Sequence, residues 1–77
     1  MEKYKMQSID RLDISDKAIK MFRENKIETL GELCCKTKTE LKEMELKQGE
    51  TKVYKLSEDE FKQIDLDLGE IGLHLAL

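Results

Sequence analysis

Residues 27–41 read IETLGELCCKTKTEL and contain two helix-start signals in close succession. In each signal a threonine is followed three positions later by a glutamate, first at Thr29 and Glu32 and then at Thr37 and Glu40. This spacing is that of a capping box, in which the two side chains hydrogen-bond backbone N–H groups left free at a helix start. Apolar residues follow each box at helical spacing, so we expect two short helices that each bury one apolar face.

A longer helix is expected before this stretch. Ser15 is a good N-cap for a helix that begins at Asp16, which places an acid in the first turn. The helix should end near Asn25 and Lys26, because asparagine tolerates the left-handed conformation of a C-cap. The apolar side of this helix, which we expect in the core, consists of Ala18, Met21 and Phe22.

The last helix is expected to be the longest. A third capping box, from Ser57 to Glu60, opens this helix, and Gly72 ends it as a C-cap. Its apolar residues recur every three or four positions and form one stripe, namely Phe61, Ile64, Leu68 and Ile71. Three capping boxes, each directly before an apolar periodic run, indicate three separate helix starts.

The helical pattern fails in two places. In residues 45–55 we expect a loop or a short extended piece, with Tyr54 and Leu56 folding back onto the core. Residues 1–8 are expected to form a flexible N-terminal lead-in, so that residues 9–77 make up the domain. The predicted fold class is all-α, a compact single domain of four or five short helices that are stabilised by packing against one another.

The composition limits the size and class of the protein. The 77 residues include 14 Lys and Arg and 17 Asp and Glu, a net charge of −3, and suffice for one small domain. No apolar run approaches the ~20 residues of a membrane helix, and the N-terminus lacks the apolar core of a secretory signal. We therefore expect a cytoplasmic protein without membrane contact. Residues 1–42 carry a net charge of +2 and residues 43–77 one of −5, so only the first half offers nucleic acid a basic face.

Neither a catalytic nor a metal site is indicated. Cys34 and Cys35 are adjacent, and two neighbours in a helix cannot form a disulfide without distorting the peptide between them. We expect two reduced thiols, one in the core and one at the surface, and zinc-ligand spacing is missing. His74 is expected at the rim of the core, with no visible nucleophile or orienting acid. We therefore predict that the protein is not an enzyme and uses no cofactor, no metal and no small-molecule substrate.

Five short motifs follow one another along the chain. They are Leu12-x-Ile14-Ser15-x-Lys17-Ala18, Ile27-x-Thr29-Leu30-Gly31-Glu32-Leu33, Lys36-Thr37-x-x-Glu40-Leu41, Phe61-x-x-Ile64 and Leu68-x-x-Ile71-Gly72-Leu73-x-Leu75. Apart from the interval between Leu41 and Phe61, their order and spacing resemble the C-terminal domain of the bacterial RNA polymerase alpha subunit. A looser resemblance is to helix–hairpin–helix or SAM-like folds of five helices.

The resemblance implies a non-catalytic domain that contacts A·T-rich promoter DNA through the minor groove and the DNA backbone. It also implies that the domain binds activator proteins. The DNA surface of such a domain comes from the start of the first core helix and from a Gly-Lys hairpin before the last helix. This chain departs from the family at both places. Lys17 stands where the family has an arginine, and Lys20 stands near a family asparagine. Ser57-Glu58-Asp59-Glu60 replaces the Gly-Lys hairpin and puts acids where phosphate would bind.

Two functional hypotheses from different classes follow. The first is a transcription-linked module that uses the first core helix to contact transcription proteins or to bind A·T-rich DNA weakly. Its DNA-binding candidates are Lys17, Lys20, Arg23 and Ser57. The alternative is a protein–protein adaptor whose acidic last helix binds a basic partner without DNA; its candidates are Glu58, Asp59 and Asp65, extended by Asp67 and Glu70. For both sets, a solvated helix face or simple helix capping is the plainer explanation. An exposed Ile19 on the first core helix would hint at self-association.

Overall fold

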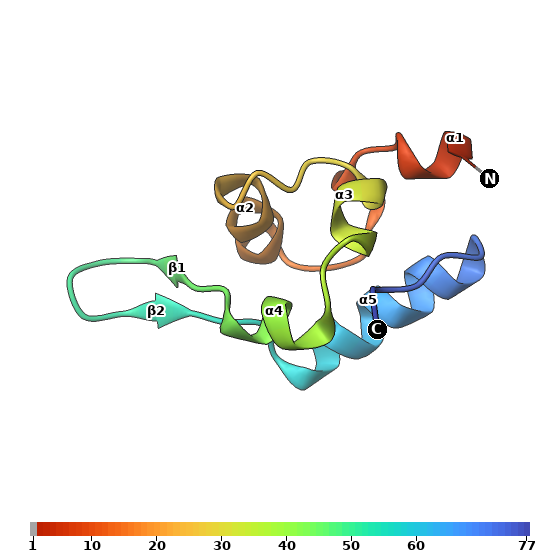
Figure 1. Cartoon of the computed structure of the whole chain (residues 1–77). Helices are drawn as coiled ribbons and strands as arrows, with labels where there is room; N and C mark the ends of the chain where they lie inside the picture. Colours follow the sequence, from red (N-terminus) through yellow and green to blue (C-terminus); the bar gives the residue numbers. More distant parts are fainter. Residues whose placement is uncertain (1) are drawn as a thin grey trace.

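The computed structural model describes residues 2–77, which form short helices and one hairpin (Figure 1). Along the chain the elements are α1 (Glu2–Lys5), the 3₁₀ turn η1 (Ile9–Arg11), α2 (Asp16–Glu24), α3 (Leu30–Cys34), α4 (Lys38–Glu43), β1 (Leu46–Lys47), β2 (Val53–Tyr54) and α5 (Glu58–Glu70). The molecule measures 41 × 20 × 20 Å, and the hairpin of β1 and β2 extends beyond the helices at one end (Figure 1). Within residues 2–77, no helix is long and apolar enough to cross a membrane.

The helix starts follow the signals in the sequence. The Ser15 side chain accepts a hydrogen bond of 3.2 Å from the backbone N–H of Ala18 and caps α2. All three predicted capping boxes are confirmed; they pair Thr29 with Glu32, Thr37 with Glu40, and Ser57 with Glu60. An N-cap side chain of this kind stabilises a helix by about 1 kcal/mol, which matters for helices as short as α3 and α4.

Helix α5 ends in a Schellman motif at the predicted Gly72. This glycine has a φ of 77°, and its N–H donates to the carbonyl of Gly69 at 3.2 Å. The N–H of Leu73 donates to the carbonyl of Leu68 at 2.8 Å. These two bonds satisfy the last carbonyls of α5 and turn the chain back, so that Leu73 and Leu75 are buried.

Helix α2 ends where expected, but a different residue adopts the left-handed conformation. Lys26 has a φ of 63°, whereas Asn25 has a φ of −97°. The side-chain amide of Asn25 instead donates to the carbonyl of Met21 at 2.8 Å. The N–H of the buried Ile27 donates to the carbonyl of Phe22 at 2.8 Å, which places the left-handed turn directly before Ile27. The prediction that Asn25 supplies this conformation is therefore wrong.

The core is built from the apolar faces that the periodicity predicts. The expected residues that are buried are Ala18, Met21, Phe22, Leu30, Leu33, Leu41, Phe61, Ile64 and Leu68. Ile71 is half-buried against them, and Tyr54 and Leu56 pack onto the core as expected. Ile19 is half-buried at the edge of the core, so it is not the fully exposed side chain that we expected.

The all-α fold class is wrong, because the chain also contains a small antiparallel sheet. β1 and β2 pair Leu46 with Tyr54 and Lys47 with Val53. Leu46 is buried and Tyr54 half-buried on one face of the hairpin, while Lys47 and Val53 are exposed on the other. This alternation is typical of a half-buried strand, but two residues per strand are too few to distinguish a strand from a loop in the sequence.

The segment before η1 lies against α3. Helix α1 packs on α3, and a Cβ at Gly31 would lie only 3.0 Å from the carbonyl oxygen of Lys5. The N–H of Leu30 donates to the carbonyl of Gln7 at 2.9 Å. The expected lead-in is therefore partly helical, and Gly31 is the residue that permits its close approach. Whether residues 1–8 are flexible in solution stays a prediction.

Candidate functional site

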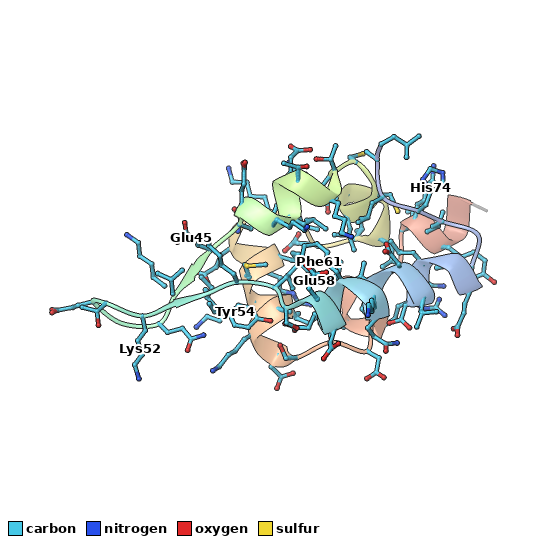
Figure 2. The ribbon with its side chains drawn as sticks, turned by 90° about the horizontal axis from the view of Figure 1, so that it is seen from below. Glu45, Lys52, Tyr54, Glu58, Phe61 and His74 are labelled. Atoms are coloured by element: carbon cyan, nitrogen blue, oxygen red, sulfur yellow. The ribbon has the colours of Figure 1, made fainter. Side chains whose placement is uncertain are left out.

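Three polar side chains join α2, β2 and α5. The Oγ of Ser15 donates to Oε2 of Glu60 at 2.9 Å and lies 3.2 Å from the hydroxyl oxygen of Tyr54. The Tyr54 hydroxyl donates a short hydrogen bond to Oε1 of Glu60. Figure 2 shows Tyr54 at the base of the hairpin, beside the start of α5 where Glu58 lies. This Ser15–Tyr54–Glu60 cluster therefore holds the first turns of α2 and α5 next to each other.

The protonation states within the cluster follow from its contacts. Burial acts to raise the pKa of Glu60, but the hydrogen bonds from Tyr54, Ser15 and Ser57 outweigh it, so the pKa of Glu60 lies below its ordinary value. Burial, and the hydrogen bond that the hydroxyl donates to Glu60, raise the pKa of Tyr54 to about 12. At neutral pH the tyrosine is therefore a donor and the glutamate an anion.

The first turns of α2 and α5 border a groove of about 850 Å³, which we name the α2–α5 groove. Its charged lining consists of Asp13, Asp16, Lys17, Asp59 and Glu60. Four acids therefore face one base. This excess of acidic charge sets up a negative potential in the groove, which attracts cations and repels phosphate.

The predicted DNA-binding candidates are split between two places. Lys17 lines the α2–α5 groove, while Lys20 and Arg23 line a second groove on the other side of α2. Arg23 forms an exposed ion pair with Asp10 at 2.5 Å, so an acid already lies beside its guanidinium group. The hydroxyl of Ser57 accepts a hydrogen bond from the backbone N–H of Glu60 at 3.2 Å and serves as the N-cap of α5.

The predicted acidic candidates are divided as well. Asp59 lines the α2–α5 groove. Glu58 instead lies beside α4, where its Oε1 is 3.8 Å from Nζ of Lys42, a long and exposed pair that contributes little. Asp65 is exposed on α5 outside the lining of this groove, and Asp67 accepts a hydrogen bond from the side-chain amide of Gln63 at 2.9 Å. Of the three candidates, only Asp59 shares the groove with the start of α2.

Reasoning from the sequence missed the acids on the α2 side of the groove. Asp13 and Asp16 line it, and the backbone N–H of Asp13 donates to the carboxylate of Asp67 on α5 at 2.8 Å. The sequence favours packing for Tyr54, with base stacking as the alternative, and does not predict that its hydroxyl helps to hold the groove together. No local signal reveals these roles, because the contacts join residues far apart in the chain.

Residues 1–46 match the family model of the C-terminal domain of the bacterial RNA polymerase alpha chain. The chain belongs to this family. The match includes all of α2 and ends at Leu46, the first residue of β1, so that α5 lies beyond it. A search of the curated proteins finds no match. Alpha C-terminal domains are non-catalytic interaction domains that meet DNA or proteins of the transcription machinery.

The α2–α5 groove lies where the family resemblance predicts a binding surface. The resemblance in the sequence implies a DNA surface made of the start of the first core helix and the turn before the last helix; this stays a prediction, because the family match ends before α5. In this chain those segments are the starts of α2 and α5, which the bond between Ser15 and Glu60 joins directly. The surface that they form here carries more acid than base.

The cysteines and the histidine lie away from this groove. Cys35 is exposed at the surface as expected, whereas Cys34 is half-buried against the core and not fully within it; both are free thiols. Burial raises the pKa of the Cys34 thiol, which lowers its reactivity. The Nδ1 of the exposed His74 lies 2.8 Å from the carbonyl oxygen of Leu75. Among residues 2–77, no group of three or more His, Cys, Asp or Glu side chains is placed to hold a metal ion.

Proposed function

We propose that this alpha C-terminal domain is a transcription interaction module whose α2–α5 groove binds a basic segment of a protein partner. The observation that carries the proposal is the charge of the groove, whose lining contains Asp13, Asp16 and Asp59 together with the single base Lys17. A partner with lysine or arginine side chains is attracted to this surface, and the acids orient it. The phosphate backbone of a nucleic acid is repelled by the same acids.

The start of α5 supports the same proposal. A helix start binds phosphate through free backbone N–H groups and the positive end of the helix dipole. Here Ser57 occupies the N–H of Glu60, and three acids, Glu58, Asp59 and Glu60, lie in the first turn and complement the dipole. These acids stand where a phosphate would need to bind, so the helix start favours a cationic ligand.

The second candidate function is weak binding of A·T-rich DNA through the outer face of α2. Lys17 and Lys20 favour it, because neither forms an ion pair among the residues that the structure describes. Two or three lysine contacts give weak binding that falls steeply with salt. The neighbouring Asp13, Asp16 and Asp59 oppose it, and lysine lacks the planar fork that suits a narrow minor groove.

Fluorescence anisotropy with a labelled Lys/Arg-rich peptide, and separately with a short A·T-rich duplex, tests the proposal. We expect the peptide to bind at physiological salt and the duplex to bind only at low salt. Asp59→Asn should weaken peptide binding about two- to fivefold, since it removes one groove charge. Asp65→Asn is the matched control, because it removes the same charge from the same helix outside the groove lining.

The result that would overturn the proposal is equally concrete. If the duplex binds at physiological salt and the peptide does not, DNA is the ligand and Lys17→Ala should weaken it. If Asp59→Asn and Asp65→Asn weaken the peptide equally, the peptide responds to net charge alone and the α2–α5 groove is not its site.

A further inference from the structure

A second groove lies on the other side of the first turn of α2, and its lining combines apolar and charged side chains. This groove measures about 600 Å³ and lies between the segment before α2 and the outer face of α2. Leu12, Ile14 and Ile19 supply its apolar lining. Leu12 is buried, whereas Ile14 and Ile19 are half-buried at the edge of the core. Part of each isoleucine side chain therefore remains in contact with water, and covering it is favourable.

The two grooves form one continuous surface, because Ile14 and Asp16 line both. Asp16 lines the second groove together with Ile14 and Ile19, so a cationic side chain that pairs with Asp16 lies in the same groove as these two isoleucines. The first turn of α2 thus separates an acidic groove from a partly apolar one.

We infer that the protein partner is amphipathic: its basic side chains occupy the α2–α5 groove, and one bulky aliphatic side chain lies on Ile14 and Ile19. This inference rests on the proposed function and adds to it the chemistry of the partner. A purely charged segment leaves the isoleucines in water, and a purely apolar one leaves the acids without counter-charges.

The charges around both grooves fit this partner. Six acidic and three basic side chains line the combined surface, a net charge of −3. Arg23 is already paired with Asp10 at 2.5 Å. Lys20 lies one helical turn from both Asp16 and Glu24, which flank it on α2. The cations of the second groove therefore have acidic neighbours, and a basic partner is not excluded from it.

The two grooves are expected to contribute differently to binding, because ion pairs and buried aliphatic side chains contribute different free energies. Exposed ion pairs contribute little affinity on their own and are screened by salt. Burying an aliphatic side chain away from water contributes more free energy of binding per contact than such an ion pair does. The acids around Asp59 therefore orient the partner and speed its approach, while Ile14 and Ile19 supply most of the affinity that survives at physiological salt.

Two peptides that differ at one position provide the test. The first is rich in lysine and arginine and has one leucine, and the second has serine in place of that leucine. Calorimetric titration of the native protein should show the leucine peptide binding at least about fivefold tighter. Ile19→Ala should remove most of this difference, because the leucine of the first peptide then loses the aliphatic surface that it covers. Asp59→Asn should weaken both peptides by the same factor.

Each outcome has a distinct meaning. Equal binding of the two peptides to the native protein overturns the inference and leaves the proposed function intact, because charge alone then accounts for the affinity. Failure of both peptides to bind, even at low salt, contradicts the proposed function and the inference with it. The peptide comparison needs no protein variant, and circular dichroism shows separately whether Ile19→Ala keeps the native fold.

Discussion

The Oγ of Ser15 donates a 2.9 Å hydrogen bond to Oε2 of Glu60, a residue 45 positions later in the chain. Ser15 caps α2, and Glu60 completes the capping box of α5 with Ser57. One carboxylate therefore stabilises two helix starts that come from different halves of the sequence. Because Asp16 and Asp59 lie beside these starts, the same bond also shapes the acidic α2–α5 groove.

Tyr54→Phe should lower the stability of the protein. The change removes the hydroxyl that donates to Glu60 and contacts Ser15, and a hydrogen bond to a charged group contributes on the order of 1.5–3 kcal/mol. Because water can partly replace the lost hydroxyl as a hydrogen-bond donor, we expect the free energy of unfolding to fall by about 1–2 kcal/mol. Urea unfolding followed by circular dichroism measures it. Asp59→Asn, an exposed change next to Glu60 in the first turn of α5, is the control, and equal stability of the two variants would contradict the role given to Tyr54.

Acid should destabilise the protein through its capping-box glutamates. The pKa values of Glu32 and Glu40 are lowered, chiefly by hydrogen bonds from backbone N–H groups, and that of Glu60 is lowered despite its burial. A folded-state pKa below the unfolded value means that the unfolded chain binds more protons as the pH falls. Stability should therefore be full above the ordinary pKa of glutamate, about 4.3, and decline as the pH falls through the folded values.

Urea midpoints measured from about pH 7 down to about pH 3 test this dependence. Glu60→Gln removes one of the titrating groups, so its midpoint should be lower at neutral pH and change less on acidification. A midpoint that rises on acidification would contradict the assigned direction of these pKa shifts.

Lys26→Gly should stabilise the end of α2. Lys26 has a φ of 63°, a conformation that glycine adopts without the steric cost of a Cβ. We expect a gain of up to about 1 kcal/mol in the free energy of unfolding, measured by thermal or urea unfolding. Lys20→Gly, inside α2, is the matched control and should lose about 1 kcal/mol. A loss at Lys26 as large as that at Lys20 would show that glycine has no advantage at this turn.

Gly31→Ala and Gly69→Ala should have opposite effects on stability, although both glycines lie in helices. A Cβ at Gly31 would lie 3.0 Å from the carbonyl oxygen of Lys5, so α1 must shift away, at a net cost on the order of 1 kcal/mol. A Cβ at Gly69 meets nothing within 4 Å, so alanine should stabilise α5 by about 0.5–1 kcal/mol. Thermal unfolding distinguishes the signs, and amide exchange at Leu30 reports whether α1 has loosened.

The parts of the fold that the sequence predicts are those set by local chemistry. A capping box such as that of Thr29 and Glu32 is complete within four residues, so each helix start is visible in the sequence. The sequence allows a short extended piece in residues 45–55 but does not reveal the hairpin, because two residue pairs, Leu46 with Tyr54 and Lys47 with Val53, give no measurable period. The left-handed Lys26 was missed because the burial of Ile27, not the preference of Asn25, sets the turn.

The candidate site was less accessible to prediction for the same reason. Family resemblance identified Lys17 and the start of α5 as the segments of interest. The meeting of Ser15 with Glu60 depends on tertiary packing, and so does the choice of which acid of α5 faces α2, Asp59 or Asp65. Neither relation has a signature in a single sequence, so the acidic groove emerges only from the structure.

The most direct test of the central claim is an amide-shift titration of the isotope-labelled protein with the Lys/Arg-rich peptide and, in parallel, with the A·T-rich duplex at physiological salt. The account predicts peptide-induced shifts at Asp16, Lys17 and Asp59, little change at Asp65, and no shifts with the duplex. Shifts at Lys17 and Lys20 with the duplex, together with none from the peptide, would contradict it and show that the domain binds DNA.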